Sequence, residues 1–226
     1  MKIINILILL TLLTNSLYAE NFNFSSDKTS ISLAKGSEQT SLSGHAQIIS
    51  ENTTITADYI VLFGDDFKYA RCRGNVLVLD KNKGLQINTE KLFYDRKAEI
   101  MTINSYAEMI DQKNEIIVKG SYFENRGKEN ITIIQIGVRI FKAGDNDSMI
   151  CRSEFAKYNR ENETLELAGM PIVIWKDDEY HASRITIDLD TDNINMTGEV
   201  SGTIKSDAEK PVDKSVPIKH EEKTVE

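Results

Sequence analysis

A pattern that recurs about every 30 residues constrains the fold of this chain more than any other feature of its sequence. Each recurrence opens with a small residue, and a short apolar run follows it, as in Gly74-Asn75-Val76-Leu77-Val78. The intervals between successive small residues are 30, 31, 32, 32 and 33 residues. Such a period indicates stacked units that share a core, because one unit of short strands cannot bury its apolar face alone. The small residues are Gly44, Gly74, Ser105, Gly137, Gly169 and Gly202.

The composition of each unit predicts strands. A second apolar run follows each opening after about 15 residues, as at 54–62, 85–95 and 180–190. These runs are rich in Ile, Val, Thr, Phe and Tyr, and clusters of Gly, Asn and Asp separate them. No stretch combines a sustained helical period with helix caps. The sequence therefore predicts an all-β domain of about five strand-pair repeats over residues 31–205, preceded by a short extension at 20–30.

The two ends of the chain differ from this middle part. Lys2 precedes an apolar run over 3–13, and Ala19 closes the segment, which is the order of a secretory signal peptide at 1–19. An uncleaved membrane anchor is the alternative, although the run is shorter than the ~20 residues of a comfortable span. The tail at 206–226 is charged, contains proline and is poor in apolar residues, so we expect it to be disordered. The domain itself is expected outside the cytoplasm.

Charge and residue types argue against several function classes. The 27 basic and 35 acidic residues give a net charge of -8, which disfavours nucleic acid as the main partner. The three histidines have no metal-ligand spacing, and no phosphate-binding loop or serine-nucleophile motif is present. We therefore expect a protein that is not an enzyme and that uses no metal and no cofactor. Cys72 and Cys151 lie more than two units apart, which disfavours a direct disulfide without excluding one.

Several of these runs together resemble the OstA-like domain of lipopolysaccharide-transport proteins, the group that includes LptA, LptC and the N-terminal domain of LptD. The resemblance extends from about Ile31 to Ile204, and the first two units match best. It is weaker in the third and fourth units, since Ser105 and Gly120 stand where Gly and Ala are expected. The matching segments are Gly74-Asn75 with its alternating valines, Thr56-Ala57-Asp58-Tyr59-Ile60, Tyr94-Asp95, and Thr197-Gly198-Glu199-Val200-Ser201-Gly202.

This resemblance implies an open, twisted β-jellyroll of antiparallel sheets with an apolar groove between them. It implies a periplasmic, non-catalytic bridge that shields the acyl chains of lipopolysaccharide, or of a related glycolipid, during transport to the outer membrane. The implied partners are that lipid and other OstA-like proteins at the inner and outer membrane. Pairing at open strand edges could also join copies of the chain head to tail.

Alternation within strands supplies the candidate residues. Residues two apart share a face, so Ile55, Ala57 and Tyr59 are expected on one side of their strand. An acyl chain bound against such faces would gain ~0.8 kcal/mol for each buried CH₂. The groove candidates are Ile55, Ala57, Val76, Val78, Ile87, Ile116, Val118, Ile172, Ile174, Ile185 and Ile187, and the candidates for strand-edge docking are Ile31, Leu33, Val200 and Ile204.

Two alternative functions remain open at the level of sequence. The same alternation suits a closed, dry core, and the chain could then be a cell-envelope scaffold that associates only through its edges. A carbohydrate-binding β-solenoid is a further alternative, and it predicts an exposed aromatic platform. The identity of the amphiphile, the cleavage of the signal and the oligomeric state are likewise undetermined.

Overall fold

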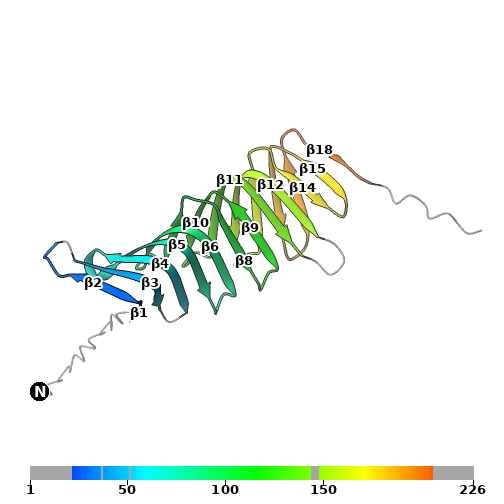
Figure 1. Cartoon of the computed structure of the whole chain (residues 1–226). Helices are drawn as coiled ribbons and strands as arrows, with labels where there is room; N and C mark the ends of the chain where they lie inside the picture. The colour runs from blue at the N-terminus through cyan, green and yellow to red at the C-terminus, as the bar shows by residue number, and fades with distance from the viewer. Residues whose placement is uncertain (1–21, 37, 51, 144–147, 206–226) are drawn as a thin grey trace, which may run out of the picture.

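The computed structural model describes residues 22–36, 38–50, 52–143 and 148–205 (Figure 1). Within these ranges the chain forms 18 β-strands and one short 3-10 turn, η1 (Asp65–Phe67). The prediction of an all-β fold is confirmed. The predicted signal peptide at 1–19 and the predicted tail at 206–226 lie outside the described residues.

The strands follow one another along the body of the molecule, and every strand pairing among the described residues is antiparallel. The first nine are β1 (Asn23–Ser25), β2 (Lys28–Ser32), β3 (Gln39–Ile49), β4 (Thr53–Phe63), β5 (Tyr69–Asp80), β6 (Leu85–Asp95), β7 (Ile100–Ile103), β8 (Ala107–Asp111) and β9 (Ile116–Gly120). The others are β10 (Tyr122–Arg126), β11 (Ile131–Lys142), β12 (Met149–Asn159), β13 (Thr164–Ala168), β14 (Ile172–Trp175), β15 (Asp178–His181), β16 (Arg184–Asp188), β17 (Asn193–Thr197) and β18 (Ser201–Thr203).

The strands form two sheets that share their long members. Strands β3, β4, β5, β6, β11 and β12 have 11 or 12 residues each, and each bends near its middle to enter both sheets. Sheet I holds one half of each long strand together with β1, β8, β9, β14, β15 and β18. Sheet II holds the other halves together with β2, β7, β10, β13, β16 and β17.

The recurring small residue of the sequence marks the bends of β3, β5 and β11, whereas β4, β6 and β12 bend without one. The register shifts between Ser43 and Ala46 in β3 and between Arg73 and Val76 in β5, on either side of a glycine with positive φ. Gly74 has φ +75°, and a Cβ there would overlap the carboxylate of Asp58 in the neighbouring strand. Only glycine meets both demands without strain. The last bend lies at Gly198 rather than at Gly202, which is part of β18.

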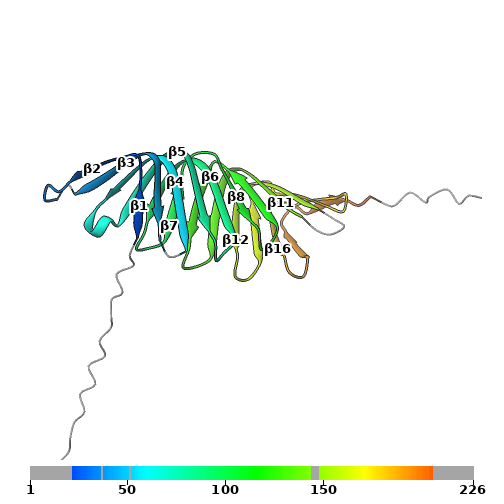
Figure 2. The same ribbon diagram turned by 60° about the horizontal axis from the view of Figure 1, so that its bottom comes forward.

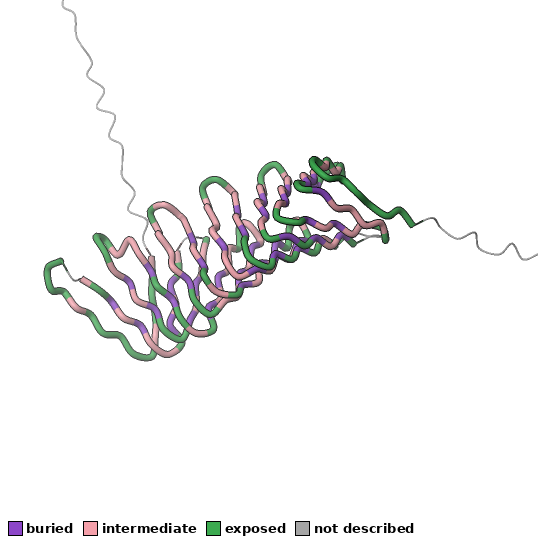
Figure 3. Tube along the Cα trace, turned by 90° about the horizontal axis from the view of Figure 1, so that it is seen from above, coloured by how far each residue is buried: buried purple, intermediate pink, exposed green. Residues whose placement is uncertain are grey.

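The body is elongated, with the first strands at one end and the last strands at the other (Figures 1 and 2). Buried residues alternate with partly exposed ones along the strands, and the buried ones form a single apolar core that extends from Leu42 to Leu189 (Figure 3). The bends lie along one side of the two-sheet body. The hairpin turns of both sheets, such as 81–84 in sheet I and 127–130 in sheet II, lie along the opposite side, which we call the mouth.

The fold begins earlier than the sequence predicts. Strands β1 and β2 pair with β3 and occupy residues that the sequence analysis assigns mostly to an extension at 20–30. Both are short and built largely from Ser, Asn, Thr and Lys, so they show no apolar alternation. Their pairing is supplied by backbone groups, which no residue pattern reports.

Candidate functional site

The interior between the two sheets is the first candidate site. Nine of the eleven groove candidates lie on its walls, with exposed fractions between 0% and 6%. Seven belong to sheet I, and Ile185 and Ile187 belong to sheet II. The nine are Ile55, Ala57, Val76, Val78, Ile87, Ile116, Val118, Ile185 and Ile187.

Sheet I carries an uninterrupted apolar row across the inner face. Each of its residues lies directly opposite the next one on the neighbouring strand, so the row runs along the long axis of the body. It consists of Ile48, Ile55, Val78, Ile87, Met109, Val118, Ile140, Cys151 and Val173. With strands ~4.8 Å apart, the row is roughly 40 Å long.

Two predicted positions lie on the other side of their strand. Val173 is fully buried opposite Cys151, whereas Ile172 and Ile174 are half-buried on the outer face of β14. The run is apolar on both faces, so alternation alone could not decide between them. Tyr59 was likewise expected on the face of Ile55, but it is 39% exposed, because the bend in β4 turns Ile60 inward instead.

The interior is filled in this structure. A cavity of about 40 Å³ lies beside the mouth, with Val78, Ile87 and Met109 among its apolar lining residues and Lys83 and Arg160 among its polar ones. A water molecule needs ~10–15 Å³ of cavity volume, so this cavity has room for about three waters. An acyl chain does not fit, so the sheets would have to separate to admit one.

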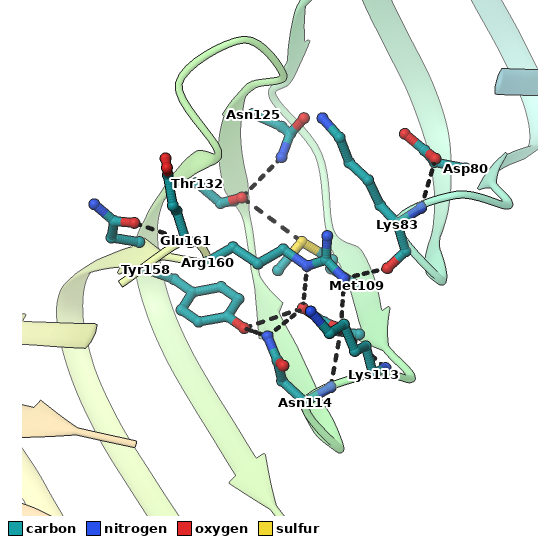
Figure 4. A network of polar contacts seen from close by, with 12 residues as sticks. Asp80, Lys83, Met109, Lys113, Asn114, Asn125, Thr132, Tyr158, Arg160 and Glu161 are labelled. Atoms are coloured by element: carbon teal, nitrogen blue, oxygen red, sulfur yellow. Dashed lines mark hydrogen bonds and ion pairs between the residues drawn. The ribbon is translucent and has the colours of Figure 1, made fainter. Parts of the chain in front are cut away.

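A buried polar network links the two sheets at the mouth (Figure 4). Asp111, at the end of β8 in sheet I, has a fully buried side chain. From sheet II it accepts hydrogen bonds from the Tyr158 hydroxyl at 3.0 Å and from the Arg160 guanidinium at 2.5 Å and 3.2 Å. Asn114 Nδ2 and the backbone N–H groups of Lys113 and Asn114 also donate to it. The carboxylate is thereby fully satisfied, as a buried charge must be.

Two further contacts extend this link. The Arg160 guanidinium also donates to the carbonyl of Lys83, and Lys83 Nζ donates to the Gly127 carbonyl at 2.8 Å. Further along the mouth, Lys142 Nζ donates to the Leu189 carbonyl and lies 3.1 Å from Asp192 Oδ1. Each contact joins a turn or strand end of sheet I to one of sheet II. We refer to Lys83, Asp111, Asn114, Tyr158 and Arg160 together as the latch.

The protonation of the latch is defined by its surroundings. Burial raises the pKa of the Tyr158 hydroxyl far above its usual range, so the hydroxyl remains a donor to Asp111. Burial lowers the pKa of Arg160, but the hydrogen bonds and charge of Asp111 outweigh this and leave that pKa raised. A neutral phenol and a guanidinium cation therefore face one carboxylate.

The latch residues were not predicted from the sequence. Asp111 and Arg160 are 49 residues apart, and the separation between Lys83 and Arg160 is 77 residues. None belongs to a short motif, and isolated charged residues in turns are expected to be solvated. Their meeting could have been predicted only by following the register of strand pairing across several strands of the repeat.

The ends of the sheets are the second candidate site. Among the described residues, β1 and β2 pair only with β3, and β17 and β18 pair only with β16 and β15. Each therefore has one edge with unpaired backbone groups. All four docking candidates lie there and are exposed: Ile31 (56%), Leu33 (77%), Val200 (53%) and Ile204 (76%).

Other chemistry is not indicated by the described part of the chain. It contains no group of three or more His, Cys, Asp or Glu residues that could hold a metal ion. Within the same ranges there is no helix that could serve as a membrane-spanning segment. Cys72 and Cys151 are free, buried thiols, and burial raises the pKa of each to about 12.

Comparisons with known proteins complete this description. Residues 24–193 match the model of one family, described as LptA/(LptD N-terminal domain) LPS transport protein. Chains of solved structures also match, among them LptH from Pseudomonas aeruginosa, described as the LptA homologous periplasmic component of the conserved lipopolysaccharide transport device. That match has 10% identity and a TM-score of 0.28, and it covers 83% of this chain and 96% of LptH. Among curated protein sequences no match was found.

Proposed function

This chain belongs to the LptA/LptD N-terminal domain family of LPS transport proteins, and from that premise we propose that it binds the acyl chains of lipopolysaccharide, or of a related glycolipid, between its two sheets. It acts in the periplasm as a non-catalytic bridge that passes the lipid toward the outer membrane. The observation that carries the proposal is the apolar row of sheet I, which continues from Ile48 to Val173 without a polar interruption.

Uptake requires the sheets to part at the mouth. The bends connect the sheets through continuous backbone, so they act as the hinge. The mouth is joined only by side-chain contacts in the described residues, chiefly the latch and the pair Lys142–Asp192. Each CH₂ that then enters the interior contributes ~0.8 kcal/mol. Several acyl chains can therefore offset the cost of opening the latch.

Transfer along a bridge requires each molecule to contact another protein at both of its ends. The free strand edges are suited to such contacts. An exposed edge pairs with another strand through backbone hydrogen bonds, while side chains on alternate positions give specificity. We propose that the β17–β18 end of one molecule joins the β1–β2 end of another copy or of a related protein at the inner or outer membrane. The exposed Val200 and Ile204 then pack against the exposed Ile31 and Leu33.

Photo-cross-linking tests the site of lipid binding. Benzoylphenylalanine replaces Leu85, which lines the cavity inside, or Gln86, the next residue of β6, which faces outside. Each variant is exported in a lipopolysaccharide-producing host, irradiated, and analysed for lipid adducts by mass spectrometry. We expect adducts at position 85 and none at 86. Equal labelling at both positions, or none at either in proteins shown to be folded by circular dichroism, would refute binding between the sheets.

A second candidate function has its own support in the filled interior. An envelope scaffold that uses the same edges without cargo needs no opening of the sheets. It predicts end-to-end oligomers that contain no lipid, whether isolated from the envelope or mixed with lipopolysaccharide. Native mass spectrometry of the oligomers distinguishes the two functions.

A further inference from the structure

The outer face of sheet II carries an aromatic cluster. The rings of Phe63, Tyr69 and Phe93 come from three adjacent strands, with centroid separations of 5.5 Å for Phe63–Tyr69, 5.5 Å for Tyr69–Phe93 and 6.5 Å for Phe63–Phe93. All three are half-buried, while their neighbours Leu62, Ala70 and Leu92 point inward and are buried. The cluster is therefore not part of the core. No short motif in the sequence predicts this cluster, because its three rings come from three different strands.

Three exposed cations, Arg71, Arg73 and Lys91, lie on the same face as these rings, and a fourth, Lys68, lies 4.8 Å from the centre of the Tyr69 ring and is ion-paired with Asp95. The Arg71 guanidinium lies 5.1 Å from the centre of the Phe63 ring, and Arg71 is paired directly with Phe93. Arg73 lies two residues further along β5, directly opposite Lys91 of β6. We call Arg71, Arg73 and Lys91 together with the three rings the outer patch.

Contacts within the sheet do not explain why Arg71, Arg73 and Lys91 lie together on this face. Like charges directly opposite each other on neighbouring strands are destabilising. Among the described residues no carboxylate lies within ion-pair distance of Arg71, Arg73 or Lys91, although the chain as a whole has a net charge of -8. Glu90 precedes Lys91, and Asp58 precedes Tyr59, which lies directly opposite Arg73, and both carboxylates are at the bends. The free protein thus keeps an uncompensated cationic pair beside half-buried rings.

The rings of the outer patch lie near the mouth, whereas Arg73 and Lys91 lie next to the bends, further from it. Phe93 and Tyr94 are consecutive residues near the end of β6, and they point to opposite faces of sheet II. Tyr94 lines the cavity between the sheets, whereas Phe93 belongs to the outer patch. An amphiphile whose apolar part enters beside Tyr94 can therefore place its polar part over the end of β6 and against the outer patch.

We propose that the outer patch binds an anionic oligosaccharide, namely the phosphate- or carboxylate-bearing sugar chain of the glycolipid whose acyl chains occupy the interior. The identity of this ligand rests on the proposed function, whereas the outer patch is defined only by the positions of its rings and cations. The negative faces of the rings attract the polarised C–H groups of a sugar. Guanidinium and ammonium groups donate charge-assisted hydrogen bonds to phosphate or carboxylate oxygens. Binding of such an anion also relieves the repulsion between Arg73 and Lys91.

The test uses a probe that cannot enter the interior. Fully deacylated lipopolysaccharide, which keeps its phosphates and lacks acyl chains, is titrated into the full mature protein by calorimetry at about 50 mM and about 300 mM salt. We expect R73Q/K91Q to weaken binding about tenfold or more, since it removes two charged donors. Phe93→Thr should weaken it as well, and added salt should weaken binding to the unaltered protein.

A matched control is present on the other sheet. Arg139 and Arg152 are also exposed and directly opposite each other, on the outer face of sheet I. R139Q/R152Q changes the net charge equally and should leave the affinity within about twofold. R73Q/K91Q should also unfold at the same or a higher temperature than the unaltered protein, because a repulsive pair is removed. A loss of affinity together with unchanged stability separates binding from a structural role.

The outcomes distinguish this inference from the proposed function. If the deacylated probe does not bind, or binds both double variants equally well, while intact lipopolysaccharide still binds, the outer patch is not a sugar site and the carrier function stands. If neither form binds, both proposals fail. Equal affinity for a probe stripped of its phosphates and carboxylates would also overturn the role assigned to the cations.

Discussion

The Arg160 guanidinium donates hydrogen bonds to the carboxylate of Asp111, whose side chain is fully buried between the two sheets. Asp111 ends β8 in sheet I, and Arg160 follows β12 in sheet II. The pair thus joins the sheets at the mouth, where the proposed groove has to open. Its strength determines how readily the interior can be reached.

The first prediction concerns the stability that this pair confers. Arg160→Met leaves the Asp111 carboxylate buried with Tyr158 and Asn114 as its remaining side-chain donors. Breaking one side of a buried ion pair costs ~3 kcal/mol or more, and we expect a loss of that size in urea unfolding. The exposed Arg152→Met is the control and should change the free energy of unfolding by less than ~0.5 kcal/mol. Equal stability of the two variants would show that the latch contributes nothing.

A cross-link across the mouth should block lipid uptake. Lys142 and Asp192 lie on opposite sheets, with Nζ and Oδ1 3.1 Å apart. Lys142→Cys/Asp192→Cys, joined by a short bismaleimide, holds the sheets together, and we expect it to lose binding of lipopolysaccharide in a native mass spectrum. The single variant Lys142→Cys with the same reagent should keep it. Undiminished binding in the cross-linked protein would mean that the sheets need not part there.

The bends impose a specific requirement for glycine. Gly74 and Gly137 both have positive φ, but a Cβ at Gly137 meets no atom within 4 Å, whereas one at Gly74 overlaps the Asp58 carboxylate. Gly137→Ala should therefore cost only the backbone strain of ~1–2 kcal/mol. Gly74→Ala should cost at least ~1 kcal/mol more. Adding Asp58→Ser to Gly74→Ala should recover part of that difference in thermal unfolding, and a lack of recovery would contradict the assigned clash.

The buried thiols predict a loss of stability in alkali. Burial raises the pKa of Cys72 and Cys151 from 9.0 to about 12, so the unfolded chain ionises first. The stability is fully present below pH 9 and falls as the pH rises from 9 towards 12, by ~1.4 kcal/mol per pH unit for each thiol. Urea unfolding at pH 8 and pH 10 measures this fall. The variant C72A/C151A should fall less over the same interval, and an equal fall would place the effect elsewhere.

Charges at the free edge should prevent end-to-end association. Val200 and Ile204 flank β18 and are exposed, so V200K/I204K should leave the monomer folded. Lysines on an edge strand oppose pairing with another strand. Light scattering after gel filtration should show monomers for this variant and larger species for the unaltered protein. Met170→Lys, at an exposed position of a bend, should associate normally. Monomers in every case would argue against edge pairing.

Much of the fold follows from local sequence. Alternation in runs such as 76–80 defines which side chains share a face, and the glycine period defines where the strands bend, because both depend on residues close together in the chain. This is why the all-β repeat architecture was predicted, and why nine of the eleven groove candidates point into the interior. The family resemblance added the expectation of an interior that can accept lipid.

The tertiary structure decided the rest. Whether Ile172 or Val173 turns inward depends on the bend before β14, and the bend in β4 likewise exposes Tyr59. The latch and the outer patch join residues from different strands, and their meeting depends on the accumulated register of the pairings between those strands. The filled interior also results from how closely the two sheets pack. The sequence by itself therefore determined the repeating strand pattern, because that pattern is local, whereas the arrangement of charges and rings around the mouth required long-range strand pairing, which no local pattern specifies.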